Sequence, residues 1–324
     1  MKIAIITPAP ARSRHGNRHT AARWATLLRG LGHRVAIAQA WDGSPADLMI
    51  ALHARRSHDS AQRFKLAYPA RPLVVVLTGT DLYRDIRCDA SARASLHMAD
   101  RLVVLQEQGL QELTAALRRK ASVIYQSARC TRRRELLKSR FMVVVSGHLR
   151  TEKDPFRTAA ALRHLPAASA IRVVHLGAAM AGDMAEEARR WMAREPRYRW
   201  MGDLPHAEAQ RRMARSHVMV ISSRMEGGAN VVSEALAAGV PVIASRVPGN
   251  VGMLGRDYAG YFAVENEQSL ARLLWRAESD TAFYRRLSRQ CAARRTLVTP
   301  QREARSLKRL LSELDKPTAT SRPR

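Results

Sequence analysis

Two glutamates, Glu226 and Glu234, stand eight positions apart in a segment that reads as strand, glycine-bearing loop, helix, glycine stop, proline and strand, from Ser222 to Ser245. Gly227 and Gly228 fall where the helix should begin. Exposed backbone N–H groups and the helix dipole make such a loop suited to an anion such as a diphosphate.

Eight helical residues overshoot two turns by about 80°, so the carboxylates of Glu226 and Glu234 would not align on one helix face. Glu226 precedes the helix, however, and its loop can turn it into the same cleft. Both carboxylates could then face one ligand. An ordinary crossover helix with two surface acids is the alternative.

Three loops of the first half are rich in arginine, histidine and hydroxyl side chains. They span residues 7–18, 52–60 and 77–85, and each follows an expected strand. Because the carboxyl ends of parallel strands meet at one edge of a sheet, we expect these loops to converge on a cleft. Their combined side chains would suit a small, doubly charged oxyanion. Solvated loop charge without a ligand is the alternative.

Short, continuous apolar strands alternate with helices along the chain, which is typical of parallel sheets covered on both faces. In the first half we expect strands over residues 2–7, 34–39, 47–52, 73–77, 101–105 and 122–125, and a helix over about 20–31. In the second half we expect strands over 141–146, 171–176, 218–222 and 241–244, and helices over 183–193 and 207–215.

The chain has 324 residues, which suits two domains of roughly 150 residues each. We therefore expect an α/β protein with two Rossmann-like, doubly wound domains, 1–130 and 141–298, facing each other across a cleft. The basic stretch 129–140 is interpreted as the linker. Residues 280–314 should be largely helical, and a helix over about 300–315 could pack back on the first domain. The polar tail from Lys316 is expected to be disordered.

The net charge is +27, from 55 Lys and Arg against 28 Asp and Glu. Such a charge fits a polyanionic partner, whether nucleic acid, an anionic membrane or phosphorylated substrates. The arginines are scattered, however, and lack the aromatic interleaving of single-strand binders, so a compositional bias toward Arg and Ala explains most of the excess.

Three cysteines, Cys88, Cys130 and Cys291, lie far apart without a CxxC motif. This argues against a structural zinc site and a disulfide framework, and it fits a reducing cytoplasm. The N-terminus is too short in apolar residues for a signal peptide, and no run approaches the roughly 18 apolar residues of a membrane-spanning helix.

The complete string from Ser222 to Ser245 resembles the donor-site motif of family-4 glycosyltransferases of the GT-B fold, in which two glutamates separated by seven residues precede Gly-x-Pro-Val. Residues 145–153 resemble the family's Gly-Arg-Leu…Lys element, whose Arg and Lys hold the donor phosphates. Lys153 keeps its place, His148 stands where arginine is usual, and Arg150 could compensate. Residues 198–202, 30–35 and 99–104 resemble the base-reading segment, the exit of the first helix and a structural strand, so the resemblance covers nearly the whole chain.

This resemblance implies a glycosyltransferase that needs no metal, and the chain contains no Asp-x-Asp. Lys153, with His148 or Arg150, would stabilise a UDP leaving group, and Glu234 would bind the donor ribose. Glu226 would hold the sugar and diphosphate together with the backbone of the run Gly227, Gly228, Ala229 and Asn230. The other donor-binding candidates are Arg199, Gly16 and Asn17.

The three loops of the first half, together with residues 147–150 and 223–234 of the second half, look like the corresponding segments of the selenosugar synthases of selenoneine biosynthesis. These are atypical family-4 enzymes that work with selenophosphate. The resemblance implies that selenium attacks the anomeric carbon of a UDP-sugar, with UDP-N-acetylglucosamine as the expected donor. UDP leaves, and loss of phosphate yields a 1-selenosugar. Because selenophosphate is already a strong nucleophile, such a site mainly positions two anions and stabilises the departing diphosphate.

The acceptor-binding candidates under this resemblance are Arg55, Arg56, His58, Arg18 and Thr80, and the catalytic candidates are Glu226, Lys153, His53 and Asp81. His53 and Asp81 are expected near the anomeric carbon. The expected partners are the UDP-sugar, selenophosphate, and enzymes that make selenophosphate or form selenoneine. No nucleic acid and no stable membrane insertion are expected.

Two other interpretations stay open. A conventional family-4 enzyme with a lipid or saccharide acceptor at a membrane surface would also carry positive charge, although no convincing basic amphipathic helix is visible. A nucleic-acid-binding protein would leave the Glu226 to Glu234 string unexplained. His15 and His19 have the spacing of metal ligands, but no third ligand lies near them in an arginine-rich loop, so we expect no metal or other cofactor.

Overall fold

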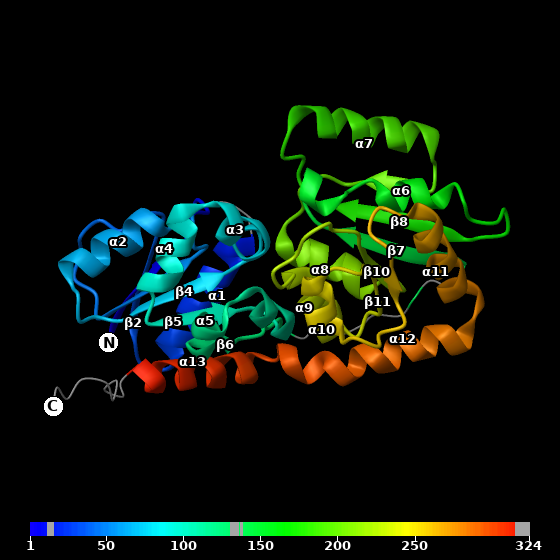
Figure 1. Ribbon diagram of the computed structural model, residues 1–324. Helices are drawn as coiled ribbons and strands as arrows, with labels where there is room; N and C mark the ends of the chain where they lie inside the picture. Colours follow the sequence, from blue (N-terminus) through cyan, green and yellow to red (C-terminus); the bar gives the residue numbers. More distant parts are fainter. Residues whose placement is uncertain (12–15, 130–135, 137–138, 315–324) are drawn as a thin grey trace. The chain divides into compact units, whose positions relative to one another are not determined.

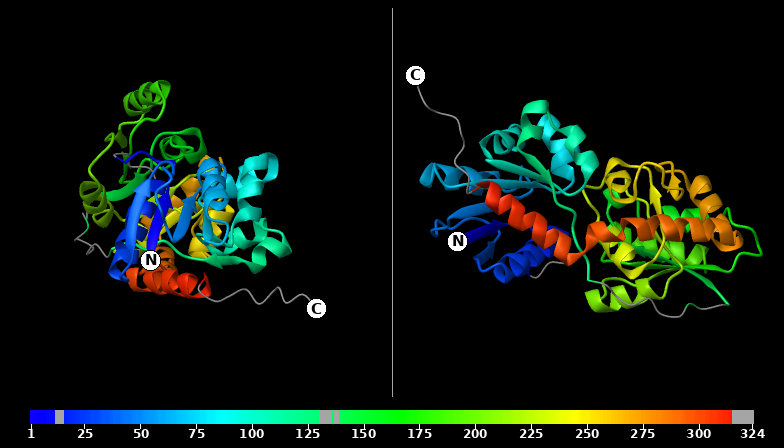
Figure 2. Two further views of the ribbon diagram at one scale, coloured as in Figure 1. Left: turned by 90° about the vertical axis from the view of Figure 1, so that its left-hand side faces the viewer. Right: turned by 90° about the horizontal axis from the view of Figure 1, so that it is seen from below.

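The structure, a computed structural model, describes residues 1–11, 16–129, 136 and 139–314, and it consists of two compact units (Figure 1; Figure 2). The first unit holds residues 1–126 and the C-terminal segment from Pro300, and the second holds residues 127–299. Each unit contains one six-stranded sheet flanked by helices. The expected α/β fold class is therefore confirmed. His15, Cys130, most of the expected linker and the tail from Lys316 lie outside the described residues.

The first unit carries a parallel sheet in the order β2-β1-β3-β4-β5-β6. Its strands are β1 (Lys2–Ile6), β2 (Arg34–Ala38), β3 (Leu48–Leu52), β4 (Leu73–Leu77), β5 (Arg101–Val104) and β6 (Ala121–Val123). Its helices are α1 (Gly16–Gly30), α2 (His58–Ala67), the π-helical turn η1 (Asp81–Asp85), α3 (Ile86–Cys88), α4 (Ala90–Met98), η2 (Glu107–Glu112), α5 (Ala115–Arg119) and α13 (Pro300–Leu314).

Alternation along the strands supplies the two cores of this unit, because successive side chains of a strand point to opposite faces. Ile3 and Ile5 face one core, which includes Trp24 of α1 and Leu307 of α13. Ile6, next to them in the chain, belongs to the opposite core, under α2 and α4. β3 and β4 are buried along their whole length, as continuous apolar strands of a covered sheet should be.

The last helix, α13, packs on α1 through a buried polar contact as well as through its leucines. Glu303 of α13 is 1% exposed and accepts hydrogen bonds from Trp24 Nε1 at 2.8 Å and from Arg23 Nε at 2.9 Å. A buried carboxylate with both partners in place fixes the position of α13 on the first unit.

The second unit carries a parallel sheet in the order β12-β11-β10-β7-β8-β9. Its strands are β7 (Phe141–Ser146), β8 (Ile171–Leu176), β9 (Tyr198–Trp200), β10 (Val218–Ile221), β11 (Val242–Ser245) and β12 (Tyr261–Phe262). Its helices are η3 (Thr151–Lys153), α6 (Arg157–Leu162), α7 (Gly182–Arg194), α8 (His206–Ala214), α9 (Asn230–Ala238), α10 (Pro248–Leu254), α11 (Glu267–Ser279), α12 (Thr281–Arg294) and η4 (Arg295–Val298).

The strand order of the second sheet reverses between β7 and β10, because β8 and β9 lie on one side of β7 and β10 to β12 lie on the other. Open parallel sheets bind ligands at the carboxyl ends of the strands beside such a switch point. The loops after β7 and β10 are therefore the place to look for a site. The two outer strands, β9 and β12, were missed in the sequence because they have three and two residues.

Candidate active site

A small hollow lies at the switch point of the second unit. Its lining comes from the ends of three neighbouring strands and the loops that follow them: Val145, Ser146, Gly147, Lys153, Pro155, His175, Val220, Ile221, Ser222, Ser223 and Glu226. Two of the expected catalytic residues, Lys153 and Glu226, are thus brought together although they are 73 positions apart.

Glu226 is the acceptor of two donors inside this hollow. Lys153 Nζ forms an ion pair with its Oε1, and Ser223 Oγ donates to the same oxygen at 2.5 Å. The Glu226 side chain is 7% exposed and that of Lys153 is 21% exposed. An anion that enters the hollow can therefore meet a lysine held in place and only partly solvated, and the attraction is stronger there than in water.

The two loops that carry this ion pair are joined through their backbones. Arg224 N donates to the carbonyl of Glu152 at 2.9 Å, and Ser222 Oγ donates to the carbonyl of Asp154 at 2.8 Å. Ser245 Oγ in turn donates to the carbonyl of Ser223 at 2.6 Å. The position of Lys153 relative to Glu226 is therefore set by buried hydrogen bonds rather than by the long side chains alone.

Two glycines permit close approach of the backbones around the hollow. A Cβ on Gly249 of α10 would lie 1.9 Å from the carbonyl oxygen of Glu226. A Cβ on Gly177, which has φ +146°, would lie 2.1 Å from the carbonyl oxygen of Gly147. Neither position has room for a side chain, so both glycines shape the site.

Glu234 lies on α9, and its carboxylate faces the start of α8. His206 Nε2 lies 2.8 Å from Glu234 Oε1, and the pairing raises the pKa of His206. Gly227, Gly228 and Ala229 form the loop before α9, which begins at Asn230 and ends at Gly239 in a left-handed conformation. The two glutamates of the motif thus contact different partners, in agreement with the poor alignment expected from their spacing.

The segment after β7 is held by two histidines. Ala178 N donates to His148 Nδ1 at 3.1 Å, which fixes the ring expected near the donor phosphates. His175 of β8 is buried, with Nδ1 2.9 Å from Tyr198 Oη and Nε2 3.1 Å from the carbonyl oxygen of Gly147. Burial lowers the pKa of His175 to about 4, so this ring is neutral at pH 7 and donates to Gly147.

Two arginines expected at the donor site are solvent-exposed: Arg150 lies at the turn before η3, and Arg199 lies on β9.

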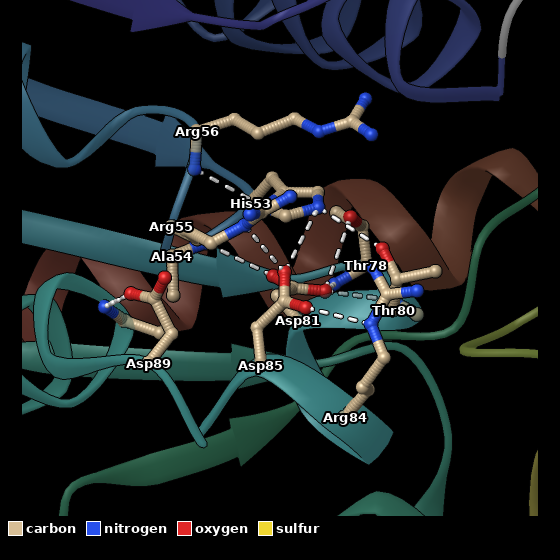
Figure 3. Close-up of polar contacts among 12 residues, drawn as sticks. His53, Ala54, Arg55, Arg56, Thr78, Thr80, Asp81, Arg84, Asp85 and Asp89 are labelled. Atoms are coloured by element: carbon tan, nitrogen blue, oxygen red, sulfur yellow. Dashed lines mark hydrogen bonds and ion pairs between the residues drawn. The ribbon is translucent and has the colours of Figure 1, made fainter. Parts of the chain in front are cut away.

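In the first unit, His53 and Thr80 follow the adjacent strands β3 and β4 and meet through their side chains (Figure 3). His53 is 3% exposed and has φ 77°, an uncommon backbone conformation for a residue other than glycine. Arg56 N donates to His53 Nδ1 at 3.3 Å, and His53 Nε2 lies 3.1 Å from Thr80 Oγ1. Because Nδ1 accepts a backbone hydrogen bond, Nε2 carries the proton of the neutral ring and donates to Thr80.

Burial is the main cause that lowers the pKa of His53, against the opposing effect of Asp81. Both ring nitrogens are already engaged within the protein. A neutral ring in this geometry orients the Thr80 hydroxyl, and the catalytic role expected for His53 stays a prediction.

Asp81 is fully buried and serves the backbone (Figure 3). Its carboxylate accepts from three main-chain N–H groups, those of Ala54 at 2.9 Å, Thr78 at 2.9 Å and Gly79 at 2.8 Å. These bonds join the loop after β3 to the loop after β4. Asp81 thus holds both loops together, and its expected place near the anomeric carbon stays a prediction.

Asp85, which the sequence did not single out, is a buried acid with two arginines beside it. Arg84 Nε donates to its Oδ1 at 3.0 Å, and Arg55 Nε lies 3.0 Å from its Oδ2. The N–H of Arg55 is not directed at that oxygen, so neither atom has an aligned hydrogen bond although both are buried. Asp85 closes the π-helical turn η1, and such turns often occur at functional sites.

The remaining acceptor candidates are spread over the first unit. Arg56 is exposed, and its guanidinium has no hydrogen-bond or ionic partner within the described residues (Figure 3). His58 Nδ1 instead lies 2.9 Å from Ser95 Oγ, which ties α2 to α4. Arg18 is half-buried in the first turn of α1, which begins with Gly16 and Asn17.

Neither a metal cluster nor a membrane span is found in the part of the chain that the structure covers. Residues 1–11, 16–129, 136 and 139–314 hold no group of three or more His, Cys, Asp or Glu placed to share an ion. None of the helices within those ranges is both long and apolar enough to cross a bilayer.

Comparisons with known proteins bear on the fold and the family. A family model described as glycosyl transferases group 1 matches residues 130–294. A search of curated proteins gives no match. The structure is similar to HepE of Anabaena in complex with UDP and glucose, with a TM-score of 0.76 and 17% identity, over 97% of this chain and 100% of that chain.

Two further solved structures are similar over almost their whole length. Sucrose-phosphate synthase from Thermosynechococcus elongatus has a TM-score of 0.77 and 17% identity, over 97% of this chain and 98% of that chain. A glycosyltransferase from Rickettsia africae has a TM-score of 0.72 and 12% identity, over 98% of this chain and 99% of that chain. These likenesses confirm the GT-B fold expected from the sequence.

Proposed function

The chain belongs to the group 1 glycosyl transferases, and on that premise we propose that it transfers a sugar from a UDP-sugar bound in the second unit. The observation that carries the donor site is the Lys153–Glu226 ion pair at the switch point of the sheet. Glu234 lies on α9, the helix that follows the Glu226 loop. The structure of HepE, which shares the fold, contains UDP and glucose, and this supports the same donor class here.

In the proposed reaction Lys153 turns from Glu226 to the diphosphate and stabilises the charge that develops as UDP leaves. Gly227, Gly228 and the start of α9 offer backbone N–H groups to the same oxygens. His148, held by Ala178, takes the place that the family gives to arginine. We propose that Lys153, the ring N–H of His148 and these backbone N–H groups stabilise the leaving group without a metal.

For the acceptor we propose selenophosphate, bound in the first unit by Arg55, Arg56 and the hydroxyl of Thr80. Two guanidinium groups and one O–H donor suit a small dianion better than a neutral sugar hydroxyl. Selenium would attack the anomeric carbon, the bond from that carbon to the diphosphate would break, and its electron pair would stay on UDP. Water would then cleave the selenium–phosphorus bond and leave phosphate and a 1-selenosugar.

Several features of the chain support this acceptor over a hydroxyl nucleophile. A hydroxyl needs a general base, whereas His53 is buried, and both its nitrogens are engaged. Selenophosphate needs only positioning. A reduced selenium product would also fit the reducing cytoplasm expected from the cysteines, and it would couple the enzyme to reactions that supply selenophosphate and consume the selenosugar for selenoneine.

The test is incubation of the protein with selenophosphate and a panel of UDP-sugars, UDP-N-acetylglucosamine among them, with products read by mass spectrometry. We expect one selenium-containing sugar and an equal amount of UDP, both lost in Lys153→Met. UDP release that needs a lipid or saccharide in place of selenophosphate would refute the acceptor and retain the donor. Absence of UDP release from every donor would refute both.

A further inference from the structure

His206 is a polar residue at the donor site that the sequence motif does not contain. It is the first residue of α8, directly after Pro205, and its Nε2 lies 2.8 Å from Oε1 of Glu234 on α9. The His206 side chain is 51% exposed and that of Glu234 is 18% exposed. Within the described residues, Oε2 of Glu234 has no hydrogen-bond partner in the protein.

The place of this pair in the sheet relates it to a ligand rather than to the core. α8 follows the loop at the carboxyl end of β9, and α9 follows the loop at the carboxyl end of β10. In a parallel sheet both loops lie at the edge where ligands bind. An ion pair exposed to this degree contributes little to stability, so stability gives little reason for its geometry.

The effect of the pair on Glu234 is to fix its carboxylate. With Oε1 held by His206, the orientation of the carboxylate is restricted, and Oε2 stays available to accept hydrogen bonds. A carboxylate accepts well from a hydroxyl, and preorganisation lowers the entropy lost on binding. The hydrogen bond from His206 to Glu234 and the charge of Glu234 raise the pKa of His206, which strengthens the pair.

We infer that His206 is a specificity-determining residue of the donor site: by holding Oε1 of Glu234 it directs Oε2 to the ribose diol of the nucleotide and so selects ribonucleotides over deoxyribonucleotides. This inference rests on the proposed donor function. His206 acts through Glu234 and is a positioning residue. Its loss should therefore change nucleotide recognition and leave the chemical step intact.

The test compares the dissociation constants of UDP, 2′-deoxy-UDP and 3′-deoxy-UDP by titration calorimetry in wild type, His206→Ala and His206→Gln. We expect wild type to bind UDP about tenfold or more tightly than at least one deoxy analogue, because a hydrogen bond to a charged group is worth that much in affinity. In His206→Ala this preference should fall to about threefold or less. His206→Gln can still donate to Glu234 and should restore most of it.

Arg211→Ala is the matched control, because Arg211 lies on the same helix and forms an exposed pair with Glu208. It should keep the wild-type preference. Turnover at saturating UDP-sugar should be unchanged in His206→Ala, while KM for the donor rises. An unchanged UDP preference in His206→Ala, or an equal loss in Arg211→Ala, would overturn the inference and leave the donor function standing. A wild-type protein that does not bind UDP would refute the donor function and the inference with it.

Discussion

Replacement of Gly249 by alanine tests whether the position of Glu226 determines activity. Gly249 is buried in α10 and packs against the backbone of Glu226. An added Cβ would lie 1.9 Å from the Glu226 carbonyl oxygen and 2.8 Å from its Cβ, whereas Cβ contacts shorter than 3.0 Å are essentially never seen. Relief of the shorter contact needs a shift of at least about 1 Å, and the opposed atom is backbone, so no side-chain rotation can supply it.

The expected magnitude follows from that shift. Misplacement of a catalytic group by 1 Å costs about 100-fold in rate, so we expect kcat/KM to fall by about 30- to 300-fold. The overpacking should also lower the free energy of unfolding by about 1–3 kcal/mol. Backbone strain adds nothing, because Gly249 has no positive φ, and alanine is the better helix former.

The assay is steady-state formation of UDP from the UDP-sugar in wild type, Gly249→Ala and Gly182→Ala. Gly182 opens α7, and a Cβ there would meet no atom within 4 Å, so this substitution is the matched control and should behave as wild type. Circular dichroism checks that both variants fold. If folded Gly249→Ala kept kcat/KM within threefold of wild type, Glu226 would not need the position assigned to it.

Three further predictions concern stability, pH and charge. Asp81→Ala leaves three backbone N–H groups without their acceptor, so it should lower the free energy of unfolding by about 3–5 kcal/mol in urea titrations. Asp81→Asn should lower it less. A loss under 1 kcal/mol in Asp81→Ala would contradict the role of this carboxylate. Because the pKa of His175 is lowered to about 4, the unfolded chain binds a proton at higher pH than the folded chain does, and stability should fall by roughly 3 kcal/mol as pH drops from about 6.5 to 4. In His175→Gln the free energy of unfolding should change by roughly 3 kcal/mol less over the same pH range than in wild type. An equal pH dependence of stability in the two proteins would count against the burial of this ring. Lys153→Met should lower kcat/KM by roughly 100- to 1000-fold, and it should also destabilise the fold by removing the ionic partner of Glu226. The double variant with Glu226→Gln should recover stability but not activity. Recovery of both would exclude a direct role for the lysine.

The sequence was most informative where chemistry depends on neighbours in the chain. The glycines before α9, the glutamates around them and the Gly239 stop could be predicted, because loop, helix and cap lie within one short segment. Lys153 was expected through a family resemblance, and the structure then placed it on Glu226.

Long-range partners could not be predicted in the same way. His206, Gly249 and Asp85 act through residues brought close by the sheets, and no local pattern marks them. His53 is a further case. Its catalytic role is predicted through a family resemblance, whereas the turn that returns the N–H of Arg56 to its ring could be seen only in three dimensions.

Both candidate sites hold their cations against buried carboxylates, and this arrangement bears on selectivity. Lys153 pairs with Glu226, which is 7% exposed, and Arg55 lies against Asp85, which is 3% exposed. An incoming anion must exchange with a carboxylate that keeps at least one other donor, Ser223 in the second unit and Arg84 in the first. The exchange therefore leaves each carboxylate with a hydrogen-bond donor, which lowers the cost of about 3–5 kcal/mol that a buried charge without any partner would have. A ligand gains from the exchange only if it attracts the cation more strongly than the carboxylate does, and a second negative charge strengthens that attraction. Although arginine is abundant throughout the chain, selectivity for doubly charged groups would arise from these two acids.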